Sequence, residues 1–361
     1  MRVIFRVDSS WEIASGHVMR CISLARFLYA RGCDIVFLSR ELPGNIISLI
    51  AKDFTVVRLG WMEDDLQAVD RELEYSAWLG GDLKKEIEEV TRVIKVLGAI
   101  DWLIVDHYAL DIKWEKEMKK YVRHLMVIDD LANREHICDL LLDQNFYKNF
   151  SQRYNDLVPK ACKLLLGPKY VLLRSEFLIA QEKVKIRNGE INRILIFMGG
   201  SDMDNITSVV LRALCKISFK GHIDVVFGVQ NKYRTEIAKE YQGQLNCNFY
   251  CQIDNMAELM LQAELAIGAG GSTTWERCCM GLPSVLVCAG NNEKEIIENG
   301  VKIGIIQAVN CANGVTSDII AESVEYFLKH PRVVNAMSAK CMEVVDGFGC
   351  ERVSQVLYDY N

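Results

Sequence analysis

The chain lacks the marks of several broad protein classes. None of its apolar runs approaches the roughly 20 residues of a membrane-spanning helix. Only 5 of its 361 residues are proline, while half are hydrophobic and 25% are charged, which excludes disordered and collagen-like chains. Its formal charge of −6 provides no basic surface for nucleic acid or for an anionic membrane. We therefore expect a folded protein that binds neither nucleic acid nor membrane.

Paired cysteine motifs are also missing, although the sequence contains 13 cysteines. The number is odd, no CxxC occurs, and no paired Cys/His spacing recurs, so we expect neither a disulfide framework nor a zinc site. Arg6 and Asp8 interrupt the first apolar stretch, which leaves no room for the core of a signal peptide. We expect a cytoplasmic protein with reduced cysteines.

Short apolar runs alternate with amphipathic stretches along the chain, and this pattern restarts after Gly189. Alternating strands and helices predict parallel sheets with helices on both faces. Because single cores rarely exceed ~250–300 residues, we predict an α/β protein with two doubly wound, Rossmann-like domains facing a cleft. The predicted domains are residues 1–180 and 181–335, followed by a helical segment, 336–361, that packs back on the first domain.

The predicted strands are short runs between loops and helices, and Arg193–Met198 is continuous and apolar, as expected for a strand buried on both faces. They are Arg2–Val7, Asp34–Leu38, Phe54–Leu59, Trp102–Val105, Leu125–Ile128 and Leu140–Leu142 in the first domain, and Arg193–Met198, Ile223–Phe227, Asn248–Tyr250, Leu265–Ile267 and Ser284–Val287 in the second.

A glycine-rich segment, Gly268–Glu276 (GAGGSTTWE), follows one predicted strand and opens a predicted helix. Glycines let the backbone approach a ligand, and the free N–H groups of a helix start bind anions, so this segment suits a diphosphate. The spacing matches neither GxGxxG nor the P-loop. Thr273 and Glu276 also form a T-x-x-E capping box, and the pattern alone leaves ligand binding and capping equally open.

A second glycine–serine loop, Gly199–Asp202, follows the first strand of the second domain. Gly200 and Ser201 are therefore candidates for contacting the same diphosphate. Asp202 and Asp204 superficially match a metal-binding DxD motif. Capping of the next helix by Asp204 or Asn205 is the favoured interpretation, so we predict no metal site.

In the first domain, His17 stands where a loop becomes a helix, within the sequence GHVMR. The positive end of the helix dipole disfavours imidazolium there, so a neutral His17 would be available to accept a proton near pH 7. Asp106–Tyr108 and Asp129–Asp130 fall at the ends of two other predicted strands, where such sheets bind ligands. Polar residues gathered there indicate a site, with isolated loop and capping roles as the alternative.

The ordered set of motifs also resembles a known family. In chain order it comprises RVDSS, GHVMRC, VDHYALDIKWE, IDDLANREHICDLLLDQN, LLGPKYVLLRSEF, MGGSD, IDNMAELM and GAGGSTTWERCCMGLPSVLV. Over nearly the whole chain these motifs resemble the hydrolases that remove UDP from UDP-2,4-diacetamido-2,4,6-trideoxy-β-L-altropyranose in pseudaminic acid biosynthesis. That family is related in architecture to the MurG-type glycosyltransferases, so the resemblance implies a GT-B-like fold.

The resemblance also implies roles for single residues. His17 would be the catalytic base that activates water. Backbone amides around Gly271, Ser272 and Thr273 would hold phosphate, and Glu276 would accept hydrogen bonds from the ribose hydroxyls. The other implied substrate contacts are Asp8, Gly16, Arg20 and Tyr108 in the first domain, and Gly200, Ser201, Asn255, Met256 and Asn292 in the second, with Asn255 and Met256 near uracil.

The implied reaction is an inverting hydrolysis of a UDP-sugar by a cytoplasmic monomer that uses neither metal nor cofactor. A nucleoside diphosphate is already a good leaving group, so the two-carboxylate arrangement of most glycosidases is not required. Two alternatives stay open at this point: a MurG-like glycosyltransferase with a UDP-sugar donor, and a non-catalytic nucleotide-sugar-binding protein.

Overall fold

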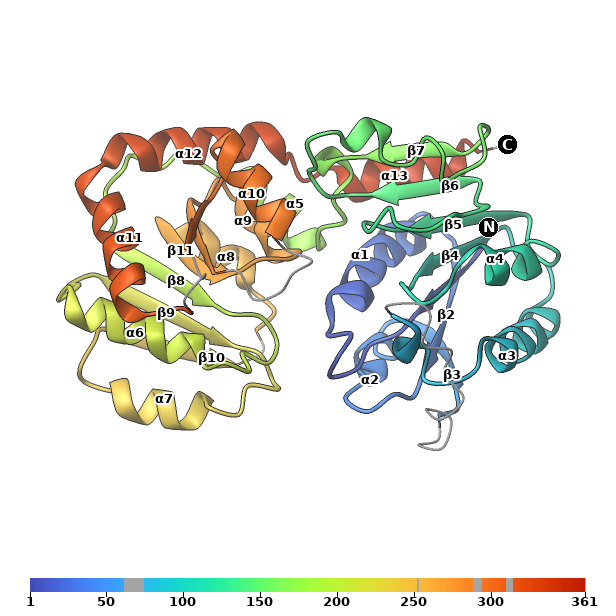
Figure 1. Ribbon diagram of the computed structural model, residues 1–361, viewed down its shortest axis with the longest axis horizontal. Helices are drawn as coiled ribbons and strands as arrows, with labels where there is room; N and C mark the ends of the chain where they lie inside the picture. Colours follow the sequence, from blue (N-terminus) through green and yellow to red (C-terminus); the bar gives the residue numbers. More distant parts are fainter. Residues whose placement is uncertain (62–74, 252, 288–293, 310–313, 361) are drawn as a thin grey trace. The chain divides into compact units, whose positions relative to one another are not determined.

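The computed structural model describes residues 1–61, 75–251, 253–287, 294–309 and 314–360. The chain divides into two compact units. The first comprises Met1–Asn145, Asn149–Arg174 and Phe348–Asn361, and the second comprises Phe146–Lys148 and Ser175–Gly347. Each unit is built around one parallel sheet (Figure 1), which confirms the predicted pair of doubly wound α/β domains.

The first unit contains a seven-stranded sheet with the order β3-β2-β1-β4-β5-β6-β7. Its strands are β1 (Arg2–Val7), β2 (Asp34–Arg40), β3 (Thr55–Leu59), β4 (Trp102–Asp106), β5 (His124–Ile128), β6 (Leu140–Asp143) and β7 (Lys163–Leu166). The strand order reverses at the neighbouring strands β1 and β4. The carboxyl ends of these two strands therefore form the switch point at which α/β sheets bind their ligands.

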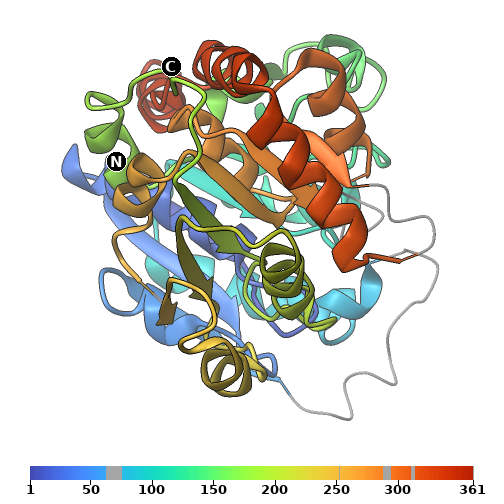
Figure 2. The ribbon, with the colours of Figure 1, turned by 90° about the vertical axis from the view of Figure 1, so that its left-hand side faces the viewer.

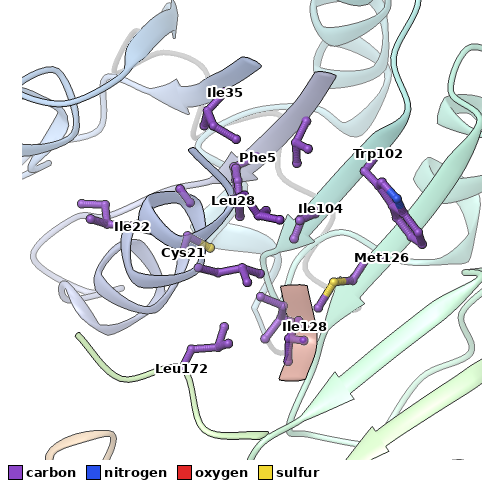
Figure 3. Close-up of a cluster of buried hydrophobic side chains, with 14 of the residues drawn as sticks. Phe5, Cys21, Ile22, Leu28, Ile35, Trp102, Ile104, Met126, Ile128 and Leu172 are labelled. Atoms are coloured by element: carbon purple, nitrogen blue, oxygen red, sulfur yellow. The ribbon is translucent and has the colours of Figure 1, made fainter. Parts of the chain in front are cut away.

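Helices cover both faces of the first sheet. They are α1 (Gly16–Ala30), α2 (Ile47–Ile50), α3 (Leu83–Leu97), α4 (Ile112–Met118) and α13 (Gly349–Tyr358), with short 3-10 helices η2 (Ser76–Leu79), η3 (Phe150–Gln152) and η4 (Pro168–Tyr170). Strand side chains alternate between two cores. Phe5 and Trp102 pack with side chains of α1 and α13, as Figure 3 shows in part, whereas Ile4 and Leu103 pack with those of α3 and α4.

The second unit contains a six-stranded parallel sheet with the order β10-β9-β8-β11-β12-β13. Its strands are β8 (Arg193–Phe197), β9 (His222–Phe227), β10 (Cys247–Cys251), β11 (Leu265–Ala269), β12 (Ser284–Val287) and β13 (Gln307–Val309). Its helices are α5 (Ser175–Gln181), α6 (Ile206–Lys216), α7 (Arg234–Tyr241), α8 (Met256–Gln262), α9 (Thr273–Cys279), α10 (Lys294–Ile303), α11 (Ser317–Lys329) and α12 (Pro331–Val344). Helix α11 packs beside α6, as Figures 1 and 2 show. The strand order reverses at β8 and β11, whose carboxyl ends form a second switch point.

The limits of the units differ from the predicted boundaries at 180/181 and 335/336. Helix α5 contacts α8 and α9 of the second unit, which moves the first boundary to Arg174 and Ser175. Helix α12 also packs against α9, so the first part of the predicted returning segment, residues 336–347, belongs to the second unit. Only the segment from Phe348, with α13, packs on α1 of the first unit. The sequence patterns also missed the short strands β7 and β13.

Every cysteine in the described part of the chain is a free thiol. Within the same residues, no helix combines the length and apolar composition required to cross a bilayer.

Candidate active site

His17 lies at the carboxyl edge of the first sheet, in the first turn of α1. Its Nδ1 atom is 2.6 Å from Oδ1 of Asp106, the last residue of β4. Both side chains are buried. The fold brings them together at the β1/β4 switch point, although 89 positions separate them in the sequence. The result is an imidazole paired with a carboxylate.

The charge of Asp106 determines how this pair shares its protons. Burial alone would raise the pKa of Asp106, but the Arg20 guanidinium and His17 hold that pKa well below its ordinary value. An ionised carboxylate only accepts hydrogen bonds, so Nδ1 of His17 donates to it. The second ring nitrogen, Nε2, makes no hydrogen bond within the described residues. Its lone pair is therefore available to take a proton.

Arg20 holds Asp106 in place. Its Nε and Nη2 atoms donate to the two oxygens of Asp106, each at 2.6 Å, and its Nη1 donates to Asp130 at 3.0 Å. All three guanidinium nitrogens are thus engaged by buried carboxylates. The structure therefore gives Arg20 a positioning role, where the sequence predicted a substrate contact.

Tyr108 completes this cluster. Its hydroxyl donates to Asp130, which also accepts a hydrogen bond of 3.0 Å from Asn145. Burial and the charge of Asp130 raise the pKa of Tyr108 well above its ordinary value, so the hydroxyl remains a donor. The phenol ring meets the imidazole of His17 edge-on, with 4.7 Å between centroids. The structure thus assembles the predicted residues His17, Arg20 and Tyr108 in one place.

Two further aromatic rings lie beside His17. Trp78, from η2, stacks on Tyr108 with 5.2 Å between centroids and 21° between planes, and it lies edge-on to His17 at 5.9 Å. Tyr75 lies 4.8 Å from Trp78 and 5.1 Å from Tyr108 between centroids. Tyr75 and Trp78 are both partly exposed. We refer to Tyr75, Trp78 and Tyr108 as the aromatic wall.

Asp8 directly follows β1, the strand that pairs with β4, and it is fully buried. It accepts hydrogen bonds from Nη1 of Arg6 at 2.6 Å and from the backbone N–H of Arg40 at 2.7 Å, and its second oxygen is 3.2 Å from Nε2 of His107. The structure corrects the prediction that Asp8 contacts the substrate, because its carboxylate is enclosed by its own partners. Gly16, by contrast, begins α1 with open space where a Cβ would project.

A pocket of about 220 Å³ lies at the switch point of the second sheet. Its lining includes Met198 and Ser201 from the loop after β8, Ala269 at the end of β11 and Val287 at the end of β12. Ser201 of the first predicted glycine loop and Ala269 of the predicted segment Gly268–Glu276 therefore line the same pocket of the second unit.

Asp202 caps the helix that follows the first of these loops. Its carboxylate accepts from the backbone N–H groups of Ile206 at 2.8 Å and Thr207 at 3.1 Å. Asn205 occupies the N-cap position but makes no capping hydrogen bond with its side chain, so the prediction of Asp204 or Asn205 as the cap is corrected to Asp202. Across the described ranges, no group of three or more His, Cys, Asp or Glu side chains is placed to hold a metal ion.

The second loop presents free backbone donors. The N–H groups of Gly271, Ser272 and Thr273 make no hydrogen bond within the described part of the chain. Gly271 has a positive φ of 81°, which glycine adopts without strain. Helix α9 begins at Thr273 with Ser272 as its N-cap, and no side-chain capping bond forms there. Thr273 therefore lies inside the helix and does not occupy the N-cap position that the anticipated T-x-x-E capping box assigns to it.

Arg277 forms hydrogen bonds with residues at both ends of this loop. Its buried guanidinium donates to the carbonyl oxygen of Ala269 at 2.8 Å and to Oγ1 of Thr274 at 3.1 Å. A Cβ on Gly268 would lie 2.7 Å from Nη1 of Arg277 and 2.6 Å from the carbonyl oxygen of Phe197, so only glycine permits this packing. The loop is thus fixed by close packing at its start.

The other residues predicted to contact the substrate are Glu276, Asn255, Met256 and Asn292. Glu276 is partly exposed in the first turn of α9. Asn255 is the N-cap residue of α8, with Nδ2 at 3.3 Å from Oε2 of Glu258, while the Met256 side chain is buried. Asn292 lies outside the described residues.

Sequence reasoning missed several residues of both sites. Asp106 and Asp130 were recognised as polar residues at strand ends, but neither was paired with His17 or Arg20. Their position after neighbouring strands was the signal available, since the carboxyl ends of parallel strands share one edge. Nothing in the local pattern around Trp78 or Arg277 indicated a place in a site.

The two parallel-sheet α/β units have a GT-B-like fold. Residues 193–343 match the C-terminal domain of glycosyltransferase family 28. The structure is similar to that of Acinetobacter baumannii MurG, with a TM-score of 0.65, 12% identity and 99% of both chains covered. It is also similar to UDP-GlcNAc 2-epimerase from Neisseria meningitidis, with a TM-score of 0.63, 12% identity, and 99% and 100% of the chains covered. At these identities the likeness establishes the fold alone.

Two proteins of similar sequence each match more than four fifths of this chain. The chain is 26% identical over 310 residues to an uncharacterised protein of Methanocaldococcus jannaschii, a match to 84% of this chain and to only 58% of that protein's length. It is 26% identical over 295 residues to the UDP-2,4-diacetamido-2,4,6-trideoxy-beta-L-altropyranose hydrolase of Campylobacter jejuni, covering 81% of this chain and 94% of that one. The resemblance to this hydrolase, inferred from the ordered motifs, is confirmed.

Proposed function

We propose that the protein is an inverting hydrolase of UDP-2,4-diacetamido-2,4,6-trideoxy-β-L-altropyranose, releasing UDP and 2,4-diacetamido-2,4,6-trideoxy-L-altrose. The observation that carries the proposal is the His17–Asp106 pair, a base oriented by a buried carboxylate, whose Nε2 has no hydrogen-bond partner among the described residues. A protein that only binds nucleotide sugars needs no such base. The resemblance to the Campylobacter jejuni hydrolase supports this choice of substrate.

In the proposed reaction, His17 acts as a general base. Nε2 takes a proton from water while the water oxygen forms a bond to the anomeric carbon of the sugar. The bond from that carbon to the diphosphate oxygen breaks, and its electron pair leaves with UDP, so a single displacement inverts the configuration. Asp106 remains ionised and stabilises the imidazolium that forms. A positioned base of this kind contributes roughly 10²–10⁴-fold to the rate.

The second unit is proposed to receive the leaving group. The N–H groups of Gly271, Ser272 and Thr273, which have no partner in the described ranges, would donate to the diphosphate, with further contacts from the loop of Gly200 and Ser201. These donors can meet the charge that develops on UDP, so the proposed reaction needs neither a metal nor a cofactor. Glu276 would accept from the ribose, Asn255 and Met256 would lie near uracil, and Gly16 and Asn292 would contact the substrate.

One assay separates this function from its alternatives. Purified protein is incubated with the diacetamido UDP-sugar in the absence of any acceptor, and UDP release and the configuration of the free sugar are followed by NMR. Release of UDP with inverted configuration is the expected result. Release only after an acceptor is added would identify a glycosyltransferase, conversion to an isomeric UDP-sugar an epimerase, and binding without turnover a nucleotide-sugar-binding protein.

A further inference from the structure

The aromatic wall has a geometry that the general-base role of His17 does not account for. Trp78 stacks on Tyr108 at 5.2 Å, and Tyr75 contacts both rings. The same wall lies edge-on to the catalytic imidazole through Tyr108 at 4.7 Å and Trp78 at 5.9 Å. Tyr108 and Trp78 therefore contact the imidazole that is proposed to activate water, and Tyr75 contacts both of these rings.

Two residues of the aromatic wall, Tyr108 and Trp78, are positioned by the structure around them. Tyr108 is fixed through its hydroxyl, which donates to Asp130. Trp78 belongs to η2, and the residue after it, Leu79, is buried. The C-cap of this short helix is Gly80, which has a positive φ of 63°. A Cβ on Gly80 would lie 2.4 Å from Cδ2 of Leu42 and 2.9 Å from Cδ1 of Trp61, so the turn is closely packed. The indole is therefore placed by its surroundings.

Trp78 nevertheless retains exposed surface. The core tryptophans of the same unit, Trp102 and Trp114, are fully buried, whereas the indole of Trp78 keeps exposed surface beside His17. Flat aromatic faces are an effective surface for apolar ligand groups, and ligand pockets are lined mainly by such side chains around a few polar groups.

We infer that Trp78, supported by Tyr75, is a specificity-determining residue that stacks against the apolar face of the sugar. This inference rests on the proposed function: the sugar of that substrate carries a methyl group at C6 and two acetamido methyl groups, which give it more apolar surface for an indole to contact than a fully hydroxylated sugar has. His17 then meets the same sugar at its anomeric carbon. Trp78 thereby selects the sugar, while the second unit binds the nucleotide.

The experiment compares two ligands by calorimetry, UDP and UDP-2,4-diacetamido-2,4,6-trideoxy-β-L-altropyranose. Both are titrated into His17→Asn protein, so that the UDP-sugar is not consumed, with and without Trp78→Ala. Trp78→Ala is expected to weaken UDP-sugar binding about 10-fold, in keeping with the loss of one aromatic stacking partner, and to leave UDP binding unchanged. Trp78→Phe should restore most of the lost affinity, and Trp78→Leu, which keeps apolar volume without a ring, should restore less.

Tyr29→Ala provides the matched control, because Tyr29 is an exposed aromatic of the same unit at the far end of α1, in contact with Phe54. It should change neither affinity. Equal weakening of both ligands by Trp78→Ala, or no change in either, would overturn the inference and reduce Trp78 to a packing partner of Tyr108. Should Trp78→Ala not fold, the Phe and Leu variants decide the question by the same comparison. Turnover of the wild-type enzyme tests the proposed function separately, because the binding comparison requires no hydrolysis.

Discussion

Replacement of Asp106 by asparagine is a sharp test of how His17 is prepared for catalysis. Asp106 uses both oxygens to bind Arg20 and also accepts from Nδ1 of His17. Asparagine has one oxygen and one amide nitrogen in place of the two oxygens, and Oδ1 is the atom that accepts from both Nη2 of Arg20 and Nδ1 of His17. With the nitrogen at this position, Nδ1 would have to accept a hydrogen bond, which moves the ring proton to Nε2 and removes the lone pair that takes the proton from water. With the oxygen there, the neutral amide would still lack the charge that stabilises the imidazolium.

The expected loss follows from the role of the base. A general base contributes roughly 10²–10⁴-fold, which corresponds to about 3–5 kcal/mol of activation free energy. We therefore expect kcat of Asp106→Asn to fall by about 100-fold or more, with little change in UDP affinity. Arg20 keeps Asp130 as a partner, so the free energy of unfolding should fall by only about 1–3 kcal/mol.

The assay is acceptor-free UDP release, combined with urea unfolding and UDP calorimetry on the same preparations. Cys21→Ser is the matched control, because Sγ of Cys21 also lies 3.5 Å from Oδ2 of Asp106 and is equally buried, yet it has no part in proton transfer. A folded Asp106→Asn protein with kcat within a few-fold of wild type would refute the reasoning, since the tautomer of His17 would then be irrelevant.

Three further outcomes are expected. Glu276→Ala should weaken UDP binding by ~1.5–3 kcal/mol, the cost of lost charge-assisted hydrogen bonds, and unchanged affinity by calorimetry would leave Glu276 without a role in ribose binding. Turnover should survive EDTA, and a complete loss restored by Mg²⁺ or Mn²⁺ would contradict charge stabilisation by backbone amides. The pKa of Asp106 is lower in the folded state than its ordinary value of 3.8, so the ionised carboxylate stabilises the fold at pH values above 3.8. This stabilisation is lost as the pH falls from 3.8 through the lower pKa of the folded state. The difference in unfolding free energy between wild type and Asp106→Asn should therefore be largest near pH 7 and narrow below about pH 4; a difference that is constant with pH would contradict this linkage.

The architecture could be predicted from the sequence because its signals are local. Continuous apolar strands, helices with one apolar stripe and a glycine loop after Leu265–Ile267 are each encoded within a few residues. His17 was found for the same reason, since a histidine at a helix start is visible in the sequence. The domain boundaries were less accessible, because the packing of α12 against α9 depends on contacts between distant segments.

The partners of the candidate site required the folded chain. Asp106 reaches His17 across 89 positions, and Asp130 reaches Arg20 across 110, so no local pattern joins them. Asp8 shows the opposite error. It stands at a strand end, where ligands bind, but Arg6 and His107 enclose its carboxylate within the unit. Position along a strand predicts which edge a residue occupies, whereas burial decides whether a ligand can reach it.

The proposal that His17 takes the proton from water is tested most directly by the turnover number of the His17→Phe variant. Acceptor-free release of UDP is measured for wild type, His17→Phe and His17→Asn, with UDP affinity determined by calorimetry for each. We expect kcat to fall by about 100-fold or more in both variants while UDP affinity stays near the wild-type value. A folded His17→Phe protein that turned over at nearly the wild-type rate would contradict the account and place the base elsewhere.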